Sequence, residues 1–177
     1  MSGAKKDFMM PVVVLTVICL VISAALAFTN NLTKPIIDAG ASERADAVRL
    51  AVMPQADTFE KLDASGLPSS VTEAYQAKNG AGYVFTLVAK GYGGDMTILC
   101  GIDADGLITA CKTLSHSETA GLGSKTAEDE YRNQYAGKDS GLAGVSAISG
   151  ATISSKAYES AIKDAFAAFE SIRGTAQ

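Results

Sequence analysis

The chain has 177 residues and a formal net charge of −4, a length that accommodates one ordinary domain together with a membrane anchor. No basic stripe or arginine-rich arm is present, so nucleic acid is not an expected partner. With one histidine, His116, and no closely spaced cysteines, neither a multi-histidine metal site nor a zinc or iron–sulfur site is expected in this chain.

The first predicted element is a membrane-spanning helix. Residues 9–28 carry no charge, and a helix of that length, at ~1.5 Å per residue, spans the roughly 30 Å hydrocarbon core of a bilayer. A cleaved signal peptide is the alternative, because Ala25-Leu26-Ala27 fits a cleavage site. The length of the run favours an uncleaved anchor. Lys5 and Lys6 precede the run, which places the N-terminus in the cytoplasm and the rest of the chain outside.

Helical and extended patterns then divide the rest of the chain. A helix is expected from Asn30 to Val52 and a short one from Val71 to Ala77, followed by strands at Tyr83–Val88, Met96–Ile102 and Leu107–Leu114. The turn Asp103–Gly106 predicts that the last two strands form an antiparallel hairpin. Further on, the patterns predict a helix at Thr126–Ala136, a short strand at Val145–Ile148 and an amphipathic helix at Ser154–Ile172.

These elements predict an α+β fold, an antiparallel sheet with packed helices plus one N-terminal transmembrane helix. The expected organisation has three parts. Residues 1–29 form a cytoplasmic tip and the transmembrane helix, residues 30–70 a helical stalk and linker, and residues 71–177 the functional domain.

Two of the three cysteines flank the predicted hairpin turn. Cys100 and Cys111 could pair in an oxidising compartment. Cysteine is also among the most buried residue types, which favours two buried free thiols. The third, Cys19, lies in the apolar run.

The strongest local motif is Ser149–Ser155, at the start of the last predicted helix. Gly150 and Ala151 let the backbone approach a ligand closely, and the free N–H groups of a helix start favour an anion such as phosphate. The hydroxyls of Ser149, Thr152 and Ser154 add donors. Plain helix capping explains the same residues, and the residues alone favour it.

A second motif, Glu118–Gly123, is a glycine-rich loop with two polar side chains, Glu118 and Thr119. Gly121 and Gly123 would let a flat ring lie against the backbone. A surface connection is the simpler interpretation. A nucleotide P-loop is excluded, because residues 123–126 lack its Gly-Lys pair.

Together with Gly91-Tyr92-Gly93-Gly94, these two motifs resemble the FMN-binding domain family, and within it the G subunits of the Rnf ion-translocating ferredoxin:NAD oxidoreductases. The resemblance covers nearly the whole chain. The C subunit of the sodium-pumping NADH:quinone reductase, an extracytoplasmic flavin-binding regulatory domain and an anchor without cofactor are the alternatives. The sequence departs from the family at Ser146, where an acid is frequent, and at Ala120, where proline is frequent.

The resemblance implies a phosphoester between FMN and Thr152, made by a separate flavin transferase that takes FMN from FAD. It implies further flavin contacts from Ser149, Gly150, Ala151, Ser154, Glu118, Thr119, Gly121, Leu122 and Gly123. The chain would be a single-pass electron-transfer subunit with an extracytoplasmic domain, in contact with membrane lipid and the other members of an Rnf complex. NADH and ferredoxin would react on those other members, because this chain has no dinucleotide fingerprint and no cysteine cluster. No catalytic side chain and no metal are expected.

Overall fold

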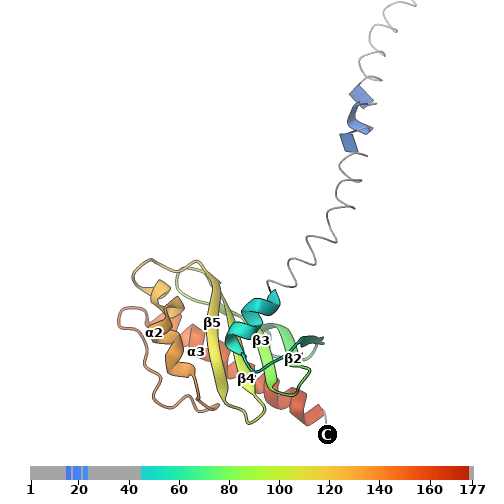
Figure 1. Cartoon of the computed structure of the whole chain (residues 1–177). Coiled ribbons are helices and arrows are strands. Elements are labelled where there is room, and N and C mark those ends of the chain that lie inside the picture. Colours follow the sequence, from blue (N-terminus) through green and yellow to red (C-terminus); the bar gives the residue numbers. More distant parts are fainter. Residues whose placement is uncertain (1–14, 17, 21, 24–44, 176–177) are drawn as a thin grey trace, which may run out of the picture. The chain divides into compact units, whose positions relative to one another are not determined.

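A computed structural model describes residues 15–16, 18–20, 22–23 and 45–175 (Figure 1). Most of the predicted transmembrane helix, and of the helix predicted at Asn30–Val52, lies outside these ranges. Their described residues, 15–16, 18–20, 22–23 and 45–52, are helical. Within the described part of the chain, no helix is both long enough and apolar enough to cross a membrane.

Five strands form one antiparallel sheet in the order in which they occur along the chain. The strands are β1 Phe59–Leu62, β2 Val71–Ala77, β3 Gly82–Lys90, β4 Asp95–Asp103 and β5 Ile108–His116. The predicted hairpin is confirmed as β4 and β5. β1 falls within the range 30–70 assigned to the stalk and linker, so the sheet begins before residue 71.

The helix predicted at Val71–Ala77 is wrong, because this segment is β2. Its alanine, glutamate and glutamine residues favour a helix. Pairing with β3 overrides that preference by placing Ala74 opposite Phe85 and Tyr75 opposite Val84. A bulge between Val71 and Glu73 also breaks the alternation of buried and exposed side chains that would have identified a strand.

Helix α3, Thr152–Thr175, confirms the predicted amphipathic helix and begins two residues earlier. Its apolar stripe lies against one face of the sheet, with Tyr158, Ile162 and Phe169 buried in the main core. On the opposite face, Val52 and Met53 pack in a second, smaller cluster. The strand residues of this cluster are Tyr75, Ala77, Val84 and Leu99. The sheet is therefore covered on both sides.

The helix predicted at Thr126–Ala136 is three short pieces, the 3-10 turns η1 Gly123–Ala127 and η2 Asn133–Tyr135 around α2 Asp129–Arg132. No strand forms at Val145–Ile148, so that prediction is wrong. None of the described strands pairs with this stretch. The Ile148 N–H instead donates to Ser155 Oγ at 3.0 Å.

The outer edge of β5 is occupied by the segment that follows η2. The Ile108 N–H donates to the Lys138 carbonyl at 2.9 Å, and the Gly137 N–H donates to the Ile108 carbonyl at 2.7 Å. Arg132 Nη1 donates to the Cys111 carbonyl at 3.0 Å. The backbone groups of Ile108 and the Cys111 carbonyl at this edge thus have partners within the same chain.

Candidate functional site

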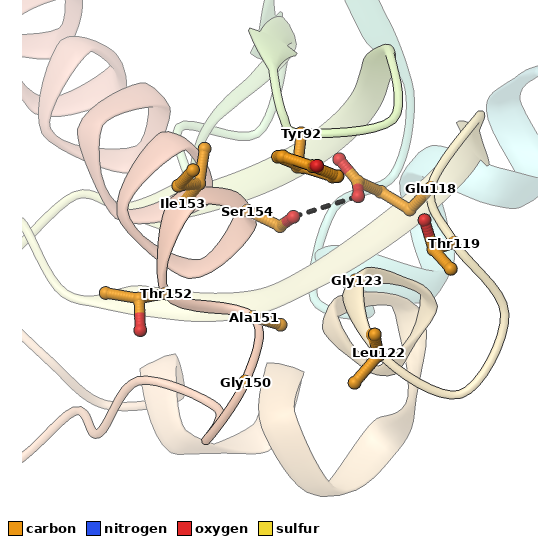
Figure 2. Close-up of a pocket in the computed structure, with 10 residues that line it drawn as sticks. All are labelled: Tyr92, Glu118, Thr119, Leu122, Gly123, Gly150, Ala151, Thr152, Ile153 and Ser154. Carbon is orange, nitrogen blue, oxygen red and sulfur yellow. Dashed lines mark hydrogen bonds between the residues drawn. The ribbon is translucent and has the colours of Figure 1, made fainter.

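A cavity of about 420 Å³ lies where three segments meet (Figure 2). The first is the turn between β3 and β4, the second the segment after β5, and the third the start of α3. The lining residues are Tyr92, Glu118, Thr119, Leu122, Gly123, Gly150, Ala151, Thr152, Ile153 and Ser154. Two motifs that are far apart in the sequence therefore form one pocket.

The Glu118 carboxylate connects the three segments. Its Oε2 accepts a hydrogen bond from Ser154 Oγ at 2.9 Å and another from the Gly93 N–H at 3.3 Å. Figure 2 shows the Ser154 side chain pointing from α3 toward this carboxylate. The other oxygen, Oε1, is buried and has no hydrogen-bond partner among the described residues. The carboxylate thus holds α3 and the β3–β4 turn against the loop that carries it.

Glycines make room for this carboxylate. A Cβ at Gly91 would overlap Oε1 of Glu118, and a Cβ at Gly123 would overlap Oε2. A Cβ at Gly93 would lie 2.6 Å from the Ser117 carbonyl oxygen. Any side chain at these positions would displace Glu118 or its loop, which explains why small residues surround it.

The start of α3 forms the opposite wall. Gly150 has a φ of +82°, a left-handed conformation that lets the chain turn into the helix. Ser154 and Ser155 are buried, and Ser155 fixes the preceding turn by accepting from Ile148. Thr152, the first helical residue, is exposed. Its hydroxyl and the free N–H groups of the first turn can bind an anion at this end of the helix dipole.

Three large apolar side chains at the pocket are exposed to solvent. Tyr92 is 75% exposed, Ile153 57% and Leu122 47%. Leu122 comes from the loop after β5, Tyr92 from the β3–β4 turn and Ile153 from α3 (Figure 2). Aromatic or apolar ligand surface placed here would cover side chains that otherwise contact water.

Most of the residues predicted from the motifs line the pocket, but Ser149 and Gly121 do not. Tyr92 and Ile153 line it and were not among the predicted site residues. Each of the two has a sequence feature by which it could have been identified. Tyr92 is an aromatic residue between glycines, and Ile153 is an apolar residue off the buried stripe of α3. In the described part of the chain, no group of three or more His, Cys, Asp or Glu side chains could hold a metal ion.

Comparison with known proteins gives two findings. The sequence model described as the FMN-binding domain matches residues 91–167, which include all three segments of the pocket. The relatives that align with most of this chain are G subunits of oxidoreductase complexes. The G subunit from the Na⁺-translocating ferredoxin:NAD⁺ oxidoreductase complex of Acetobacterium woodii is 30% identical over 90% of each chain.

Two further relatives support the same assignment. The G subunit from the proton-translocating ferredoxin:NAD⁺ oxidoreductase complex of Clostridium ljungdahlii is 27% identical over 85% of each chain. The G subunit from an ion-translocating oxidoreductase complex of Methanosarcina acetivorans is 32% identical over 91% of this chain and 94% of its own. The chain therefore belongs to the family of Rnf G subunits and contains an FMN-binding domain, which confirms the resemblance.

Proposed function

From this family membership, we propose that the chain is the electron-transfer subunit in a membrane-bound, ion-translocating ferredoxin:NAD oxidoreductase complex, with FMN bound covalently to Thr152. One observation supports the proposal most strongly. The start of α3, with Thr152, and the Glu118–Gly123 loop line the same pocket although they are remote in sequence.

The pocket fits a flavin in size and chemistry. Its volume of about 420 Å³ is in the range usual for small-molecule sites. The exposed Tyr92, Leu122 and Ile153 offer apolar surface to a flat aromatic ring. At the same time, the first turn of α3 offers N–H groups and a positive dipole end to a phosphate. Apolar and anion-binding surfaces thus adjoin, as a flavin mononucleotide requires.

In this proposal Thr152 is the attachment point that the family resemblance implies, and its exposed position leaves it accessible to a modifying enzyme. The Thr152 oxygen attacks the FMN-side phosphorus of FAD on a flavin transferase. A new P–O bond forms, the bond to the AMP half breaks, AMP leaves, and the hydroxyl proton passes to solvent. Attachment keeps the cofactor at high effective concentration where free FMN would diffuse away.

The side chains around the pocket position the cofactor. When bound, FMN supplies the electron-transfer chemistry, and nearby polar groups set how well its oxidised and reduced forms are stabilised. Glu118 holds the walls together through Ser154 and Gly93. Thr119 lines the pocket beside it and offers a hydroxyl. Electrons would reach and leave this site through other members of the complex.

A single substitution tests the attachment. The full chain and its Thr152→Ala variant are expressed with a flavin transferase, denatured and examined for in-gel flavin fluorescence. We expect the variant to lose this fluorescence. The matched control, Thr119→Ala, removes a hydroxyl from the same pocket and should keep it. Fluorescence in Thr152→Ala equal to the parent's would refute covalent attachment at this residue.

We also propose that residues 1–29 anchor the chain in the membrane and that the FMN-binding domain lies outside the cytoplasm. The charge-free run 9–28 and the preceding Lys5 and Lys6 support this topology. N-terminal sequencing of the mature protein should begin before this run. A protease added to spheroplasts should cleave the domain, and a mature N-terminus at Phe28 or protection of the domain in spheroplasts would contradict the topology.

A further inference from the structure

Cys100 and Cys111 lie directly opposite each other in the β4–β5 hairpin. Their sulfur atoms are 3.8 Å apart, and both side chains are buried in the core on the α3 side of the sheet. The other contact of Cys100 Sγ is a weak one to the Gly101 carbonyl at 4.0 Å. The thiols therefore have each other as principal polar neighbours.

The backbone already has the separation that a disulfide needs. Opposed residues of an antiparallel pair have Cα atoms roughly 4.5–5.5 Å apart, which is within the range of roughly 4.4–6.8 Å spanned by disulfides. Bond formation requires the two sulfur atoms to approach from 3.8 Å to the roughly 2.05 Å of an S–S bond. Register irregularities at Thr97/Ile98 and Gly101/Ile102 flank the pair, so a bond here would fix the hairpin between two bulges.

We infer that Cys100 and Cys111 are a disulfide site, oxidised by a disulfide-bearing oxidant while the chain folds. The thiolate of one cysteine attacks a sulfur of the oxidant and releases one oxidant thiol. The second cysteine attacks the mixed disulfide and releases the other. The chain loses two hydrogens and two electrons, and these are recovered in the two oxidant thiols. This inference rests on the proposed extracytoplasmic location of the domain, which supplies an oxidising compartment, but not on the attachment of a flavin.

Folding determines when the pair can react. In the folded chain the hydrogen bond with Cys100, reinforced by burial, holds the pKa of the Cys111 thiol well above its usual range. Since the thiolate is the attacking species, the folded dithiol reacts slowly. The oxidation state is thus fixed before the core closes. The bond would lie between the closed-end pair Ile102–Ile108 and the open-end pair Met96–His116, and would cross-link the middle of the hairpin.

The test refolds the denatured full chain in detergent with a mixture of oxidised and reduced glutathione. Remaining thiols are alkylated in denaturant, and the chain is digested with trypsin without reductant. We expect the peptide 91–112, which contains both cysteines, to be unalkylated and lighter by two hydrogens, with Cys19 alkylated. Alkylation of both cysteines, stable glutathione adducts on them, or a bond to Cys19 would overturn the inference.

Two further measurements complete the test. The oxidised chain should unfold about 5–10 °C above the reduced chain, and Cys111→Ala should show no such dependence on oxidised glutathione. An equal dependence of the unfolding temperature of Cys111→Ala on oxidised glutathione would overturn the inference. If this variant does not fold, the mass of the peptide 91–112 decides.

Oxidised glutathione added to the reduced, folded chain should leave the mass of this peptide unchanged over the same period. Rapid oxidation would refute the inference that the pair is oxidised before the core closes.

Discussion

The two ends of the β4–β5 hairpin both combine an acidic residue with glycine, yet they differ in where the acid finds its partners. At the closed end, Asp103 accepts hydrogen bonds from the N–H groups of Asp105 and Leu107, two and four residues away. At the open end, Glu118 accepts from Gly93 and Ser154, 25 and 36 residues away. The first carboxylate shapes a turn, whereas the second joins three separate segments.

The contrast shows how a structural acid can be distinguished from one that organises a site. Asp103 is satisfied by its own turn, and its role ends there. Glu118 is held in place only when the whole domain has folded, and one of its oxygens is buried with no partner in the described part of the chain. Such a group is costly unless the surrounding structure uses it, and here it assembles the walls of the pocket.

The largest expected effect comes from Gly123→Ala at the open end. The new methyl group would overlap Glu118 Oε2 and approach Ser154 Oγ, so the carboxylate must leave its hydrogen bond. We expect a loss of about 1–3 kcal/mol in the free energy of unfolding and a large loss of flavin content. Urea unfolding and flavin absorbance per protein measure the two effects.

Two further variants show whether this loss arises through Glu118. In a Glu118→Ala background, Gly123→Ala should cost much less, because the atom that it displaces is gone. At the closed end, Gly106→Ala should cost roughly 1–2 kcal/mol, because φ is +85° there, but leave flavin content unchanged. Additive costs for the two open-end changes would contradict the proposed displacement.

A smaller loss of flavin content is expected when the two acids are exchanged for alanine. Glu118→Ala leaves the buried Ser154 hydroxyl without its acceptor and should cost about 1–3 kcal/mol with reduced flavin content. Asp103→Ala exposes two turn N–H groups that water can bind, and we expect a loss of about 0.5–1 kcal/mol with normal flavin content. Equal flavin contents in the two variants would remove the functional distinction between the ends.

Thr119→Val should leave flavin content and stability close to those of the parent and change only the redox midpoint. Loss of one hydrogen bond worth roughly 0.5–1.5 kcal/mol corresponds to a shift of about 10–60 mV, depending on whether one or two electrons are transferred. Redox titration measures the shift. Thr72→Val on β2, which does not line the pocket, is the matched control. A midpoint equal to that of the control would show that Thr119 does not contact the flavin.

The smallest effect is expected for Lys61→Met, at an exposed acid–base pair on β1 and β2. Lys61 Nζ lies 2.6 Å from Glu73 Oε1, and its hydrogen bond lowers the pKa of Glu73 below the ordinary 4.5. A carboxyl with a lowered folded-state pKa stabilises the fold above its ordinary pKa, and this contribution is lost as the pH falls through the folded value. The unfolding curves of parent and variant should therefore differ slightly at neutral pH and converge in acid. Constant separation at all pH values would contradict this assignment.

The sequence was sufficient where the structure depends on local pattern. Strands β3, β4 and β5 together are rich in β-branched and aromatic residues, and the apolar residues of α3 repeat at helical spacing. The sequence was insufficient for β2 and for Val145–Ile148, because the presence or absence of a partner strand decides whether these segments form strands. Nothing in the local sequence records such pairing.

The pocket shows the same division. Ser149-Gly150-Ala151-Thr152 and Glu118–Gly123 could be identified as motifs, and the family resemblance grouped them. The bond between Glu118 and Ser154 could not be predicted, because it depends on how the end of β5 meets the start of α3. Burial of Ser154 against a carboxylate is likewise a property of the folded chain, since a serine near a helix start is usually a cap.

Groups of the same chain form hydrogen bonds along the outer edge of β5, and they affect how this domain behaves before it joins the rest of a complex. An open sheet edge can recruit a strand from another molecule and begin aggregation. Here the backbone of residues 137–138 and the Arg132 guanidinium occupy part of that edge, and the opposite edge is the four-residue strand β1. A newly made chain is thereby protected against intermolecular sheet growth while it waits for its cofactor and its neighbours.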